Sequence, residues 1–298
     1  MQYRPLGSTG LEVSAVGVGT WQLGGEWGVD FAQSDVDAIL DAAADAGVNV
    51  IDTAECYGDH RSEALIGDYL SRRDRSRWII ATKFGHHFDG FMARRDDFSV
   101  EGVRRQLDAS LAALRIDAID LYQFHSGPDA AFNNDQLWEM LHAEQARGRI
   151  RQLGASLNKS TARQAEWAAG RGIAAIQVVY NRIDQRAATV HFPFAERDAL
   201  GIIARVPLAS GLLSGKYGRG AQFPANDTRS RRPPAELKHE LREVERVRAK
   251  EVPPGVPMAQ WAIAWCLRNP LVSTVIPGCK SALQMRDNAA AADLTGVD

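Results

Sequence analysis

The sequence predicts an α/β protein built as a single (β/α)8 barrel, with an N-terminal β-hairpin that closes the bottom of the barrel. Short apolar segments typical of buried parallel strands alternate with amphipathic helical segments along the chain, without an intervening linker. Polar side chains directly follow several of these strands, which is where β/α barrels carry their active sites. With 298 residues, 45% of them hydrophobic, the chain can form one large core, and we expect residues 1–298 to be one domain.

The chain carries a formal net charge of -2 from 35 basic and 37 acidic side chains, so no long-range field draws it toward nucleic acid or an anionic membrane. No apolar run approaches the ~18 residues that span a bilayer, and the N-terminus lacks an export signal. We therefore expect a cytoplasmic protein whose partners are small molecules, without nucleic-acid or membrane partners. Nothing in the sequence indicates an oligomeric state.

The three cysteines, Cys56, Cys266 and Cys279, are an odd number without paired spacing, which predicts free thiols rather than a disulfide framework or a zinc motif. Cys56 stands beside Tyr57 and offers a thiol nucleophile as an alternative. No separate base accompanies it in the sequence, so we favour a small packing residue at this position.

The N-terminal segment predicts the hairpin and the first barrel strand. The turn Gly7–Gly10 separates two strand-like pieces, which is typical of a β-hairpin. The first barrel strand is expected over Val16–Trp21, where glycines in a strand interior indicate that another group comes close. The chain starts without a Gly-x-Gly-x-x-Gly fingerprint, which disfavours a Rossmann site. Trp21 and Trp27 are candidates for lining a substrate pocket, with rim packing as the alternative for Trp27.

The rest of the barrel follows from hydrophobic periodicity and from helix start and stop signals. Ser34 is the expected N-cap of the first helix, and Gly47 is its expected stop. The expected helices are Asp35–Ala46, Arg61–Leu70, Ser99–Leu114, Gln136–Ala146, Ser160–Ala169 and Glu236–Lys250. Seven further strands bring the barrel to eight, and they are expected over Val50–Asp52, Trp78–Lys83, Ile119–His125, Ile150–Ser156, Ala175–Val179, Ile202–Val206 and Thr274–Ile276.

Reactive side chains follow three successive strands of this barrel. Asp52 ends one strand and Tyr57 lies in the loop after it, Lys83 ends the next strand, and His125 ends the third. A lysine ammonium within about 4–6 Å favours the phenolate form of tyrosine and lowers its pKa from ~10 by about 1–3 units. We expect Asp52 to hold Lys83 charged and oriented. His125 is expected to donate to a substrate carbonyl oxygen, which Tyr57 protonates while a hydride arrives at carbon.

This arrangement resembles that of the aldo-keto reductase superfamily, whose members carry Asp and Tyr in Asp-Thr-Ala-x-x-Tyr-Gly, a Lys after the third strand and a His after the fourth. Here these positions are Asp52, Tyr57, Lys83 and His125. The opening Arg-Pro-Leu-Gly-x-Thr-Gly-Leu-x-Val-Ser and the closing Val-Ile-Pro-Gly extend the resemblance from about Tyr3 to the C-terminus. The resemblance implies an enzyme that reduces aldehydes or ketones to alcohols with NADPH, NAD being the second coenzyme option, and that uses no metal.

The resemblance also implies a nicotinamide coenzyme site. The family counterparts of Ser156 and Gln177 bind the nicotinamide carboxamide, and here Leu157 separates Ser156 from Asn158, which departs from the family's Ser-Asn pair. Arg205 stands where the family often stacks an aromatic ring on the nicotinamide, and a planar guanidinium also stacks. The coenzyme-binding residues that the resemblance implies are Gly19, Thr20, Trp21, Asp52, Ser156, Asn158, Gln177, Arg205, Pro207, Leu208, Ser210, Gly211, Leu213, Lys216, Gly278, Lys280, Gln284 and Asn288.

Two segments are expected to contact the coenzyme phosphates. Backbone N–H groups of 210–215 can cradle a pyrophosphate, and the strand end and helix start within 276–288 attract phosphate. Lys280 at this helix start predicts a preference for NADPH over NADH, which Gln284 moderates because many family members have an arginine there. The Gly-, Pro- and Arg-rich segment 217–234 is expected to be a mobile loop that folds over coenzyme, with a surface loop that never orders as the alternative.

Two other function classes stay open in the sequence. One is a coenzyme-binding regulatory subunit on the same fold, like the channel-associated β subunits, although the sequence lacks the extra N-terminal segment expected of them. The other is a metal-dependent barrel hydrolase that uses Asp52, His86 and His125, although their spacing fits no known ligand pattern. His86 and His87 are otherwise expected on a loop, Gly85–Asp97, one at the pocket wall and one in solvent. The loops that shape a substrate pocket follow no residue code, so the substrate is not predicted.

Overall fold

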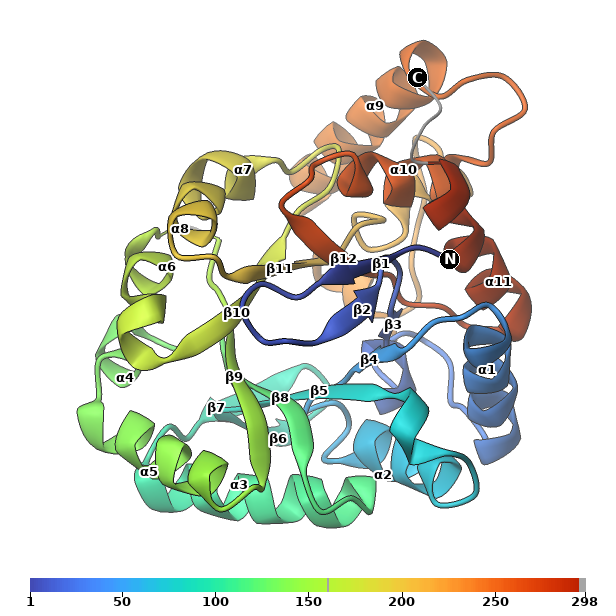
Figure 1. The fold of residues 1–298 in the computed structure, drawn as a ribbon. Coiled ribbons are helices and arrows are strands. Elements are labelled where there is room, and N and C mark those ends of the chain that lie inside the picture. Colours follow the sequence, from blue (N-terminus) through green and yellow to red (C-terminus); the bar gives the residue numbers. More distant parts are fainter. Residues whose placement is uncertain (160, 295–298) are drawn as a thin grey trace.

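The structure, a computed structural model that describes residues 1–159 and 161–294, is built around eight parallel strands (Figure 1). The barrel strands are β3 (Val18–Gly19), β4 (Val50–Asp52), β5 (Ile79–Phe84), β8 (Ile119–His125), β9 (Ile150–Ser156), β10 (Ile173–Val179), β11 (Gly201–Arg205) and β12 (Val272–Ile276). They hydrogen-bond in this order, and parallel bridges from Val16 to Val275 and from Gly19 to Gly278 join the two edges. The predicted (β/α)8 barrel is therefore confirmed.

Helices surround the barrel, and Figure 1 shows α1 to α8 around its outside with α9 at the periphery. Helix α3 illustrates why they pack there, because its apolar stripe is buried, and burying each such side chain is worth about 1.5–3 kcal/mol. The helices are α1 (Gln33–Asp45), α2 (Arg61–Leu70), α3 (Val100–Leu114), α4 (Asp129–Phe132), α5 (Asp135–Ala146), α6 (Arg163–Ala168), α7 (Arg186–Val190), α8 (Phe192–Arg197), α9 (Pro234–Lys250), α10 (Met258–Leu267) and α11 (Ala282–Ala290). Single 3-10 turns complete the structure, and they are η1 (Trp21–Gly24), η2 (Arg75–Arg77), η3 (Ala169–Arg171), η4 (Leu212–Ser214), η5 (Thr228–Arg231) and η6 (Ala291–Leu294).

A two-stranded antiparallel hairpin, β1 (Tyr3–Pro5) and β2 (Glu12–Ser14), closes the amino-terminal end of the barrel, where it lies in front in Figure 1. Its Leu6 and Val13 are buried in one apolar cluster with side chains from the barrel strands. The predicted closing hairpin is confirmed. With this end plugged by side chains, the carboxyl ends of the strands are left to form a site.

The glycines of the first barrel strand allow the barrel to close. A Cβ atom placed on Gly19 would lie 2.7 Å from the carbonyl oxygen of Ile276, closer than packed atoms come. Any side chain at this position would push β3 away from the end of β12. The predicted close approach of another group at this strand is confirmed.

Some predicted boundaries are wrong for local reasons. Helix α1 begins at Gln33, so Ser34 is not its N-cap; instead the Asp35 carboxylate accepts a hydrogen bond from the backbone N–H of Ala32. Gly47 follows the helix end with φ +77, as its predicted role as a stop requires. Ser160, the expected first residue of a helix, lies outside the described residues, and α6 begins at Arg163.

Several elements were not predicted. Residues 85–97, expected as a loop, contain a second antiparallel hairpin of β6 (His86–Gly90) and β7 (Ala93–Asp96), whose polar sequence lacks an apolar alternation. Helices α7 and α8 occupy the connection between β10 and β11, and α10 precedes β12. Helix α10 is apolar on nearly all sides, so its sequence lacks the amphipathic period that marks a surface helix.

Candidate active site

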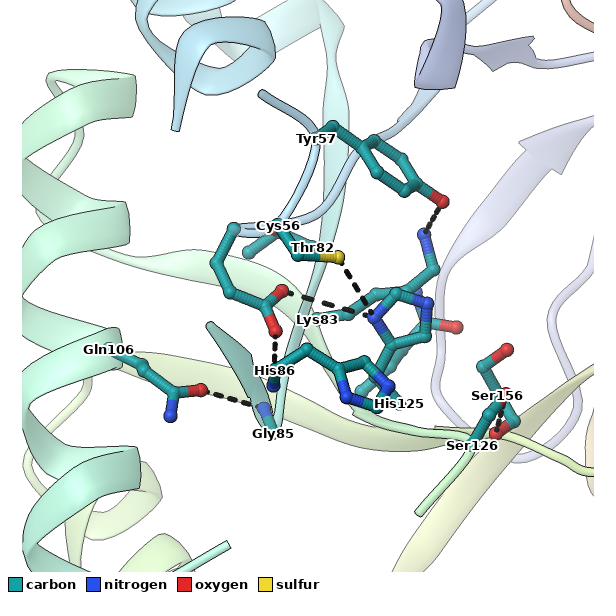
Figure 2. A network of polar contacts seen from close by, with 12 residues as sticks. Cys56, Tyr57, Thr82, Lys83, Gly85, His86, Gln106, His125, Ser126 and Ser156 are labelled. Atoms are coloured by element: carbon teal, nitrogen blue, oxygen red, sulfur yellow. Dashed lines mark hydrogen bonds and ion pairs between the residues drawn. The ribbon is translucent and has the colours of Figure 1, made fainter. Parts of the chain in front are cut away.

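Asp52, Lys83 and Tyr57 meet at the carboxyl ends of β4 and β5. The Lys83 ammonium donates to Asp52 Oδ1 at 2.7 Å and to the carbonyl oxygen of Thr53 at 2.7 Å, and it lies 3.2 Å from the Tyr57 hydroxyl. Figure 2 shows the Tyr57 hydroxyl pointing to the end of Lys83. Lys83 and Asp52 are 0% and 3% exposed, so water does not screen the pair. The three residues that the sequence predicted to interact therefore form one contiguous chain of polar contacts.

Two glutamines hold the other oxygen of Asp52. The amide of Gln177 on β10 donates to Oδ2 at 2.6 Å, and the amide of Gln123 on β8 donates to it at 3.1 Å. Sequence analysis assigned Gln177 to the coenzyme and missed Gln123. A signal for Gln123 was present, because it lies two residues before His125 on one strand and so faces the same side.

His125, the fourth member of the predicted set, ends β8 on the other side of Tyr57. Its ring meets the Tyr57 ring edge-on at a centroid distance of 6.2 Å, and its Nδ1 lies 3.8 Å from the sulfur of Cys56. Figure 2 shows this contact between Cys56 and His125 next to the Lys83–Tyr57 pair. Burial and the neighbouring Lys83 ammonium hold the pKa of His125 well below its usual range, so the ring is neutral at physiological pH.

The expected lowering of the Tyr57 pKa is wrong for the protein without substrate. Burial raises the pKa of Tyr57 above its ordinary value, and the Lys83 ammonium offsets only part of that rise. Burial also opposes the charge on Lys83, but Asp52 and Tyr57 outweigh it and raise the Lys83 pKa. Tyr57 is consequently a protonated phenol beside a fixed cation.

Glu55 is a buried acid that sequence analysis did not single out. Burial raises the pKa of Glu55 to about 8, and the backbone N–H of His86, which donates to Oε1 at 2.9 Å, offsets only part of that rise. The other oxygen, Oε2, has no hydrogen-bond partner in the described part of the chain and lies 4.0 Å from His125 Nδ1. The available signal was a second acid three residues after Asp52, between Ala54 and Cys56.

A cavity of about 450 Å³ opens beside Asp52 and Tyr57 at the carboxyl ends of the strands, and Lys83 and His125 lie behind the residues that line it. It is lined by Tyr57 and Trp27 and by most of the coenzyme candidates, namely Gly19, Thr20, Trp21, Asp52, Gln177, Arg205, Pro207, Leu208, Ser210, Gly211, Lys216, Gly278, Lys280, Gln284 and Asn288. Sequence analysis missed other lining residues, among them Gln22, Arg229, Gln260, Cys279 and Asp287. These lie on elements that come together only through the barrel seam and the long C-terminal segment.

Three coenzyme candidates are not among the residues that line this cavity. The backbone carbonyl of Ser156 accepts from Ser126, and the Asn158 amide donates to the carbonyl of Gly127 at 3.1 Å. Leu213 is fully buried in an apolar cluster with residues of α9 and α10. The geometry therefore gives these three residues packing and hydrogen-bonding partners within the protein.

The strand-to-turn segment after β11 has the backbone of a binding loop. Val206, Ala209 and Ser210 adopt φ of 59, 48 and 59, and Gly211 follows with φ 86. Left-handed backbone is costly for a β-branched residue, and such strain gathers at functional sites. Arg205 Nε in the cavity wall is buried without a hydrogen-bond partner among the described residues.

The segment expected to be a mobile loop packs against the first barrel connection. The backbone N–H of Gly28 donates to Asn226, and that of Thr228 donates to Glu26, both at 3.0 Å. The Arg229 guanidinium lies over the rings of Phe223, at 4.1 Å, and of Trp27, at 5.5 Å. This contact forms one wall of the cavity, and the folding of 217–234 over bound coenzyme stays a prediction.

Lys280 stands in the cavity wall just before α11, where the sequence predicted a cation. Its ammonium donates to the carbonyl oxygen of Trp27 at 2.6 Å, and burial lowers its pKa from the usual lysine value. The N-cap of α11 is Ser281, whose hydroxyl accepts from the backbone N–H of Gln284. Lys280 thus joins the C-terminal helix start to the Trp27 segment across the cavity.

Side chains that could ligate a metal gather at one point among the described residues, and this point is not the set of Asp52, His86 and His125 that the hydrolase alternative requires. The ligand atoms of Glu55, Cys56 and His125 lie within 4.8 Å of one another, while His86 pairs with Asp96 at 2.9 Å. Cys56 is 1% exposed and burial raises the pKa of its thiol, which disfavours a nucleophile. All three cysteines are free, as predicted.

Comparisons with known proteins agree with this geometry. The sequence model of the Aldo/keto reductase family matches residues 15–297. The uncharacterized oxidoreductase YqkF of Bacillus subtilis is 31% identical over 98% of this chain and 92% of its own length. A protein named probable voltage-gated potassium channel subunit beta, from Arabidopsis thaliana, is 30% identical over 99% of this chain and 92% of its own. The aldo-keto reductase AKR11C1 from Bacillus halodurans superposes with a TM-score of 0.84 at 27% identity, covering 100% of this chain and 93% of that one.

Within the described residues, every helix is too short or too polar to cross a bilayer.

Proposed function

Because the chain belongs to the aldo/keto reductase family of nicotinamide-dependent oxidoreductases, we propose that it reduces the carbonyl group of an aldehyde or ketone to an alcohol with NADPH. The observation that carries the proposal is the Tyr57 hydroxyl held 3.2 Å from a buried ammonium at the edge of a cavity. We take residues 1–298 as one catalytic domain.

In this proposal the reduced nicotinamide supplies the hydride, and Tyr57 supplies the proton. Tyr57 keeps its proton until reaction because burial raises its pKa. Once the substrate oxygen takes that proton, the Lys83 ammonium faces the phenolate, and Asp52 keeps Lys83 charged in a dry site. The neutral ring of His125 donates to the same substrate oxygen and fixes its direction.

The cavity offers groups that suit a dinucleotide phosphate ester. Lys216 and Lys280 supply positive charge along its wall, where Arg229 is already paired with Asp227 at 2.7 Å, and the strained backbone after Arg205 presents N–H groups. The Nε of Arg205, which has no hydrogen-bond partner among the described residues, is a buried donor that a polar ligand group would satisfy. These residues would hold the coenzyme, and Trp21, which stacks on Tyr57 at a ring distance of 6.1 Å, would cover the substrate side.

The test is a screen of aldehydes, ketones and sugars in which the loss of NADPH absorbance measures turnover. Each reaction is run with and without saturating EDTA. We expect turnover of at least one carbonyl class that EDTA leaves unchanged, because no step needs a metal. Activity that chelation abolishes and zinc restores would overturn the proposal. Each active substrate is measured again with NADH to give the coenzyme preference.

A second candidate is a coenzyme-binding regulatory subunit, favoured by the similarity to the channel β subunit of Arabidopsis thaliana. It predicts tight NADPH binding with very slow turnover. Intrinsic tryptophan fluorescence, quenched on coenzyme binding, together with the same substrate screen separates the two. Binding without turnover of any carbonyl would favour the subunit.

A further inference from the structure

The buried side of the His125 ring meets a thiol. Nδ1 lies 3.8 Å from Cys56 Sγ, within the range of a hydrogen bond that involves sulfur. The ring is neutral, so one of its nitrogens carries a proton and the other accepts. Nε2, on the other side of the ring, makes no protein hydrogen bond among the described residues. Which ring nitrogen holds the proton therefore depends on whether the thiol donates to Nδ1 or accepts from it.

The Cys56 thiol has one proton to donate. Arg94 on β7, whose guanidinium donates to Glu26 Oε2 at 2.5 Å, is a cation that acts on this thiol, and a guanidinium has only donors, so it offers the S–H no acceptor. His125 Nδ1, 3.8 Å from the sulfur, is an acceptor when the proton of the neutral ring is on Nε2. Burial raises the pKa of this thiol, so the proton stays on sulfur at physiological pH.

The other groups around Nδ1 agree with this direction. Glu55 Oε2 is 4.0 Å away, beyond hydrogen-bond distance, and burial raises its pKa to about 8, so it is neutral below that pH and does not draw a proton to Nδ1. The positive charges of Lys83, Arg205 and Arg94 oppose a second proton on the ring.

We propose that Cys56 is a positioning residue that donates its S–H to His125 Nδ1 and thereby holds His125 as the tautomer with the proton on Nε2. Resting on the proposed function, this makes Nε2–H the donor to the substrate carbonyl oxygen. Cys56 itself touches neither substrate nor coenzyme. The chain of donors runs from Cys56 to His125 and from His125 to the substrate.

Nitrogen-15 NMR of histidine measures the tautomer without turnover. The His125 signals are assigned by their loss in His125→Asn. We expect wild-type His125 to show a protonated Nε2 and an unprotonated Nδ1. Cys56→Ala removes the donor, and it is expected to give a mixture of both tautomers. Cys56→Ser keeps an O–H donor and is expected to restore the Nε2–H form.

Activity gives the second readout. Losing one hydrogen bond predicts a drop of roughly 2- to 10-fold in kcat for Cys56→Ala, with most of it recovered in Cys56→Ser. The matched control is Cys266→Ala, which deletes another fully buried thiol, one that contacts Tyr180 away from the cavity. It is expected to leave both tautomer and kcat unchanged.

Three results would overturn the inference: a protonated Nδ1 in the wild type, an unchanged Nε2–H tautomer in Cys56→Ala, or stoichiometric zinc in the purified protein. Zinc would replace the thiol proton at the Glu55, Cys56 and His125 ligands. The tautomer result stands apart from the substrate screen, so a failure of the proposed reductase activity would not be mistaken for a failure of this inference.

Discussion

Two regions of the site use charge in different ways. We call them the floor, which consists of Asp52, Tyr57 and Lys83, and the wall, which includes Lys280 and Arg229. On the floor, Asp52 and Lys83 are sealed from water and every partner is a side chain or carbonyl of the protein. On the wall, Lys280 is only partly buried and donates to the backbone carbonyl of Trp27, 253 residues away in the chain. A sealed pair must be complete in itself, whereas a wall cation can exchange its partner for a ligand phosphate. Substitutions on the floor should therefore change chemistry, and those on the wall should change affinity.

The largest expected effect tests the floor. Tyr57→Phe removes the proton donor and should lower kcat by about 10²–10⁴-fold while NADPH binding is kept. The measurement pairs steady-state kinetics with a fluorescence titration of coenzyme. Tyr122→Phe is the matched control, because Tyr122 is fully buried and its hydroxyl has no hydrogen-bond partner in the described part of the chain. Undiminished turnover in Tyr57→Phe would rule out its role as the acid.

Lys83→Met should be similarly damaging to kcat, since it removes the cation that stabilises the phenolate. It also leaves Asp52 charged and buried without its ion partner, which predicts a loss of about 3–5 kcal/mol in the free energy of unfolding. The double variant Asp52→Asn/Lys83→Met should regain part of that stability but no activity. Urea unfolding and kinetics measure the two quantities separately. Recovery of activity in the double variant would contradict the assigned role.

A smaller effect is expected on the wall. Lys280→Ala should weaken NADPH by about one to two decades, because a charge-assisted contact is worth roughly 1.5–3 kcal/mol, and it should leave NADH nearly untouched. The salt dependence of NADPH binding should flatten with the lost charge. Tryptophan fluorescence titrations with both coenzymes at two salt concentrations measure this.

The hydrogen bond from Lys280 to the Trp27 carbonyl sharpens this prediction. Were Lys280 only a link between α11 and the Trp27 segment, both coenzymes would lose affinity equally. Lys280→Met, which keeps most of the aliphatic stem, is the control for lost packing. Tighter wild-type binding of NADH than of NADPH would remove the coenzyme assignment itself.

The smallest expected effect is one of stability with pH. Glu55 is faced by His86, Glu63, Lys83, Cys56 and His125, and burial raises its pKa to about 8. Between its unfolded pKa near 4.5 and this folded value, the folded state binds the extra proton, so stability is full at low pH and falls as the pH rises to 8. Glu55→Gln should remove this dependence. Thermal unfolding should show a Tm gain over wild type that grows from pH 5 to pH 8, and a constant difference would contradict the assignment.

Asp52, Lys83 and His125 could be predicted because each lies at the carboxyl end of a strand. Parallel strands bring their carboxyl ends together, so Asp52, Lys83 and His125 were expected to meet before any contact was known. The direction of the Tyr57 pKa shift could not be predicted, because burial by many residues raises the pKa while one ammonium lowers it. A sequence motif identifies the ammonium of Lys83 but does not show how deeply Tyr57 is buried.

The residues of the wall were harder to predict from the sequence, because they come together through contacts between distant parts of the chain. Arg229 reaches the cavity through the contact of residues 226–228 with 26–28, and no local period encodes a contact over that separation. Cys56 was correctly expected as a buried free thiol, but its contact with His125 Nδ1 could not be predicted, because the two residues are 69 positions apart and meet only in the folded barrel.

The seam that closes the barrel is also part of the cavity, because Gly19 and Gly278 both bridge the two edge strands and line the site. Gln22 beside them donates to the carbonyl of Cys279, 257 residues away in the chain. Contacts of such long range are slow to form, so the cavity does not exist until the last strand has docked on the first. A ligand that binds there holds the first and last strands together, and it should slow the opening of the barrel as a whole.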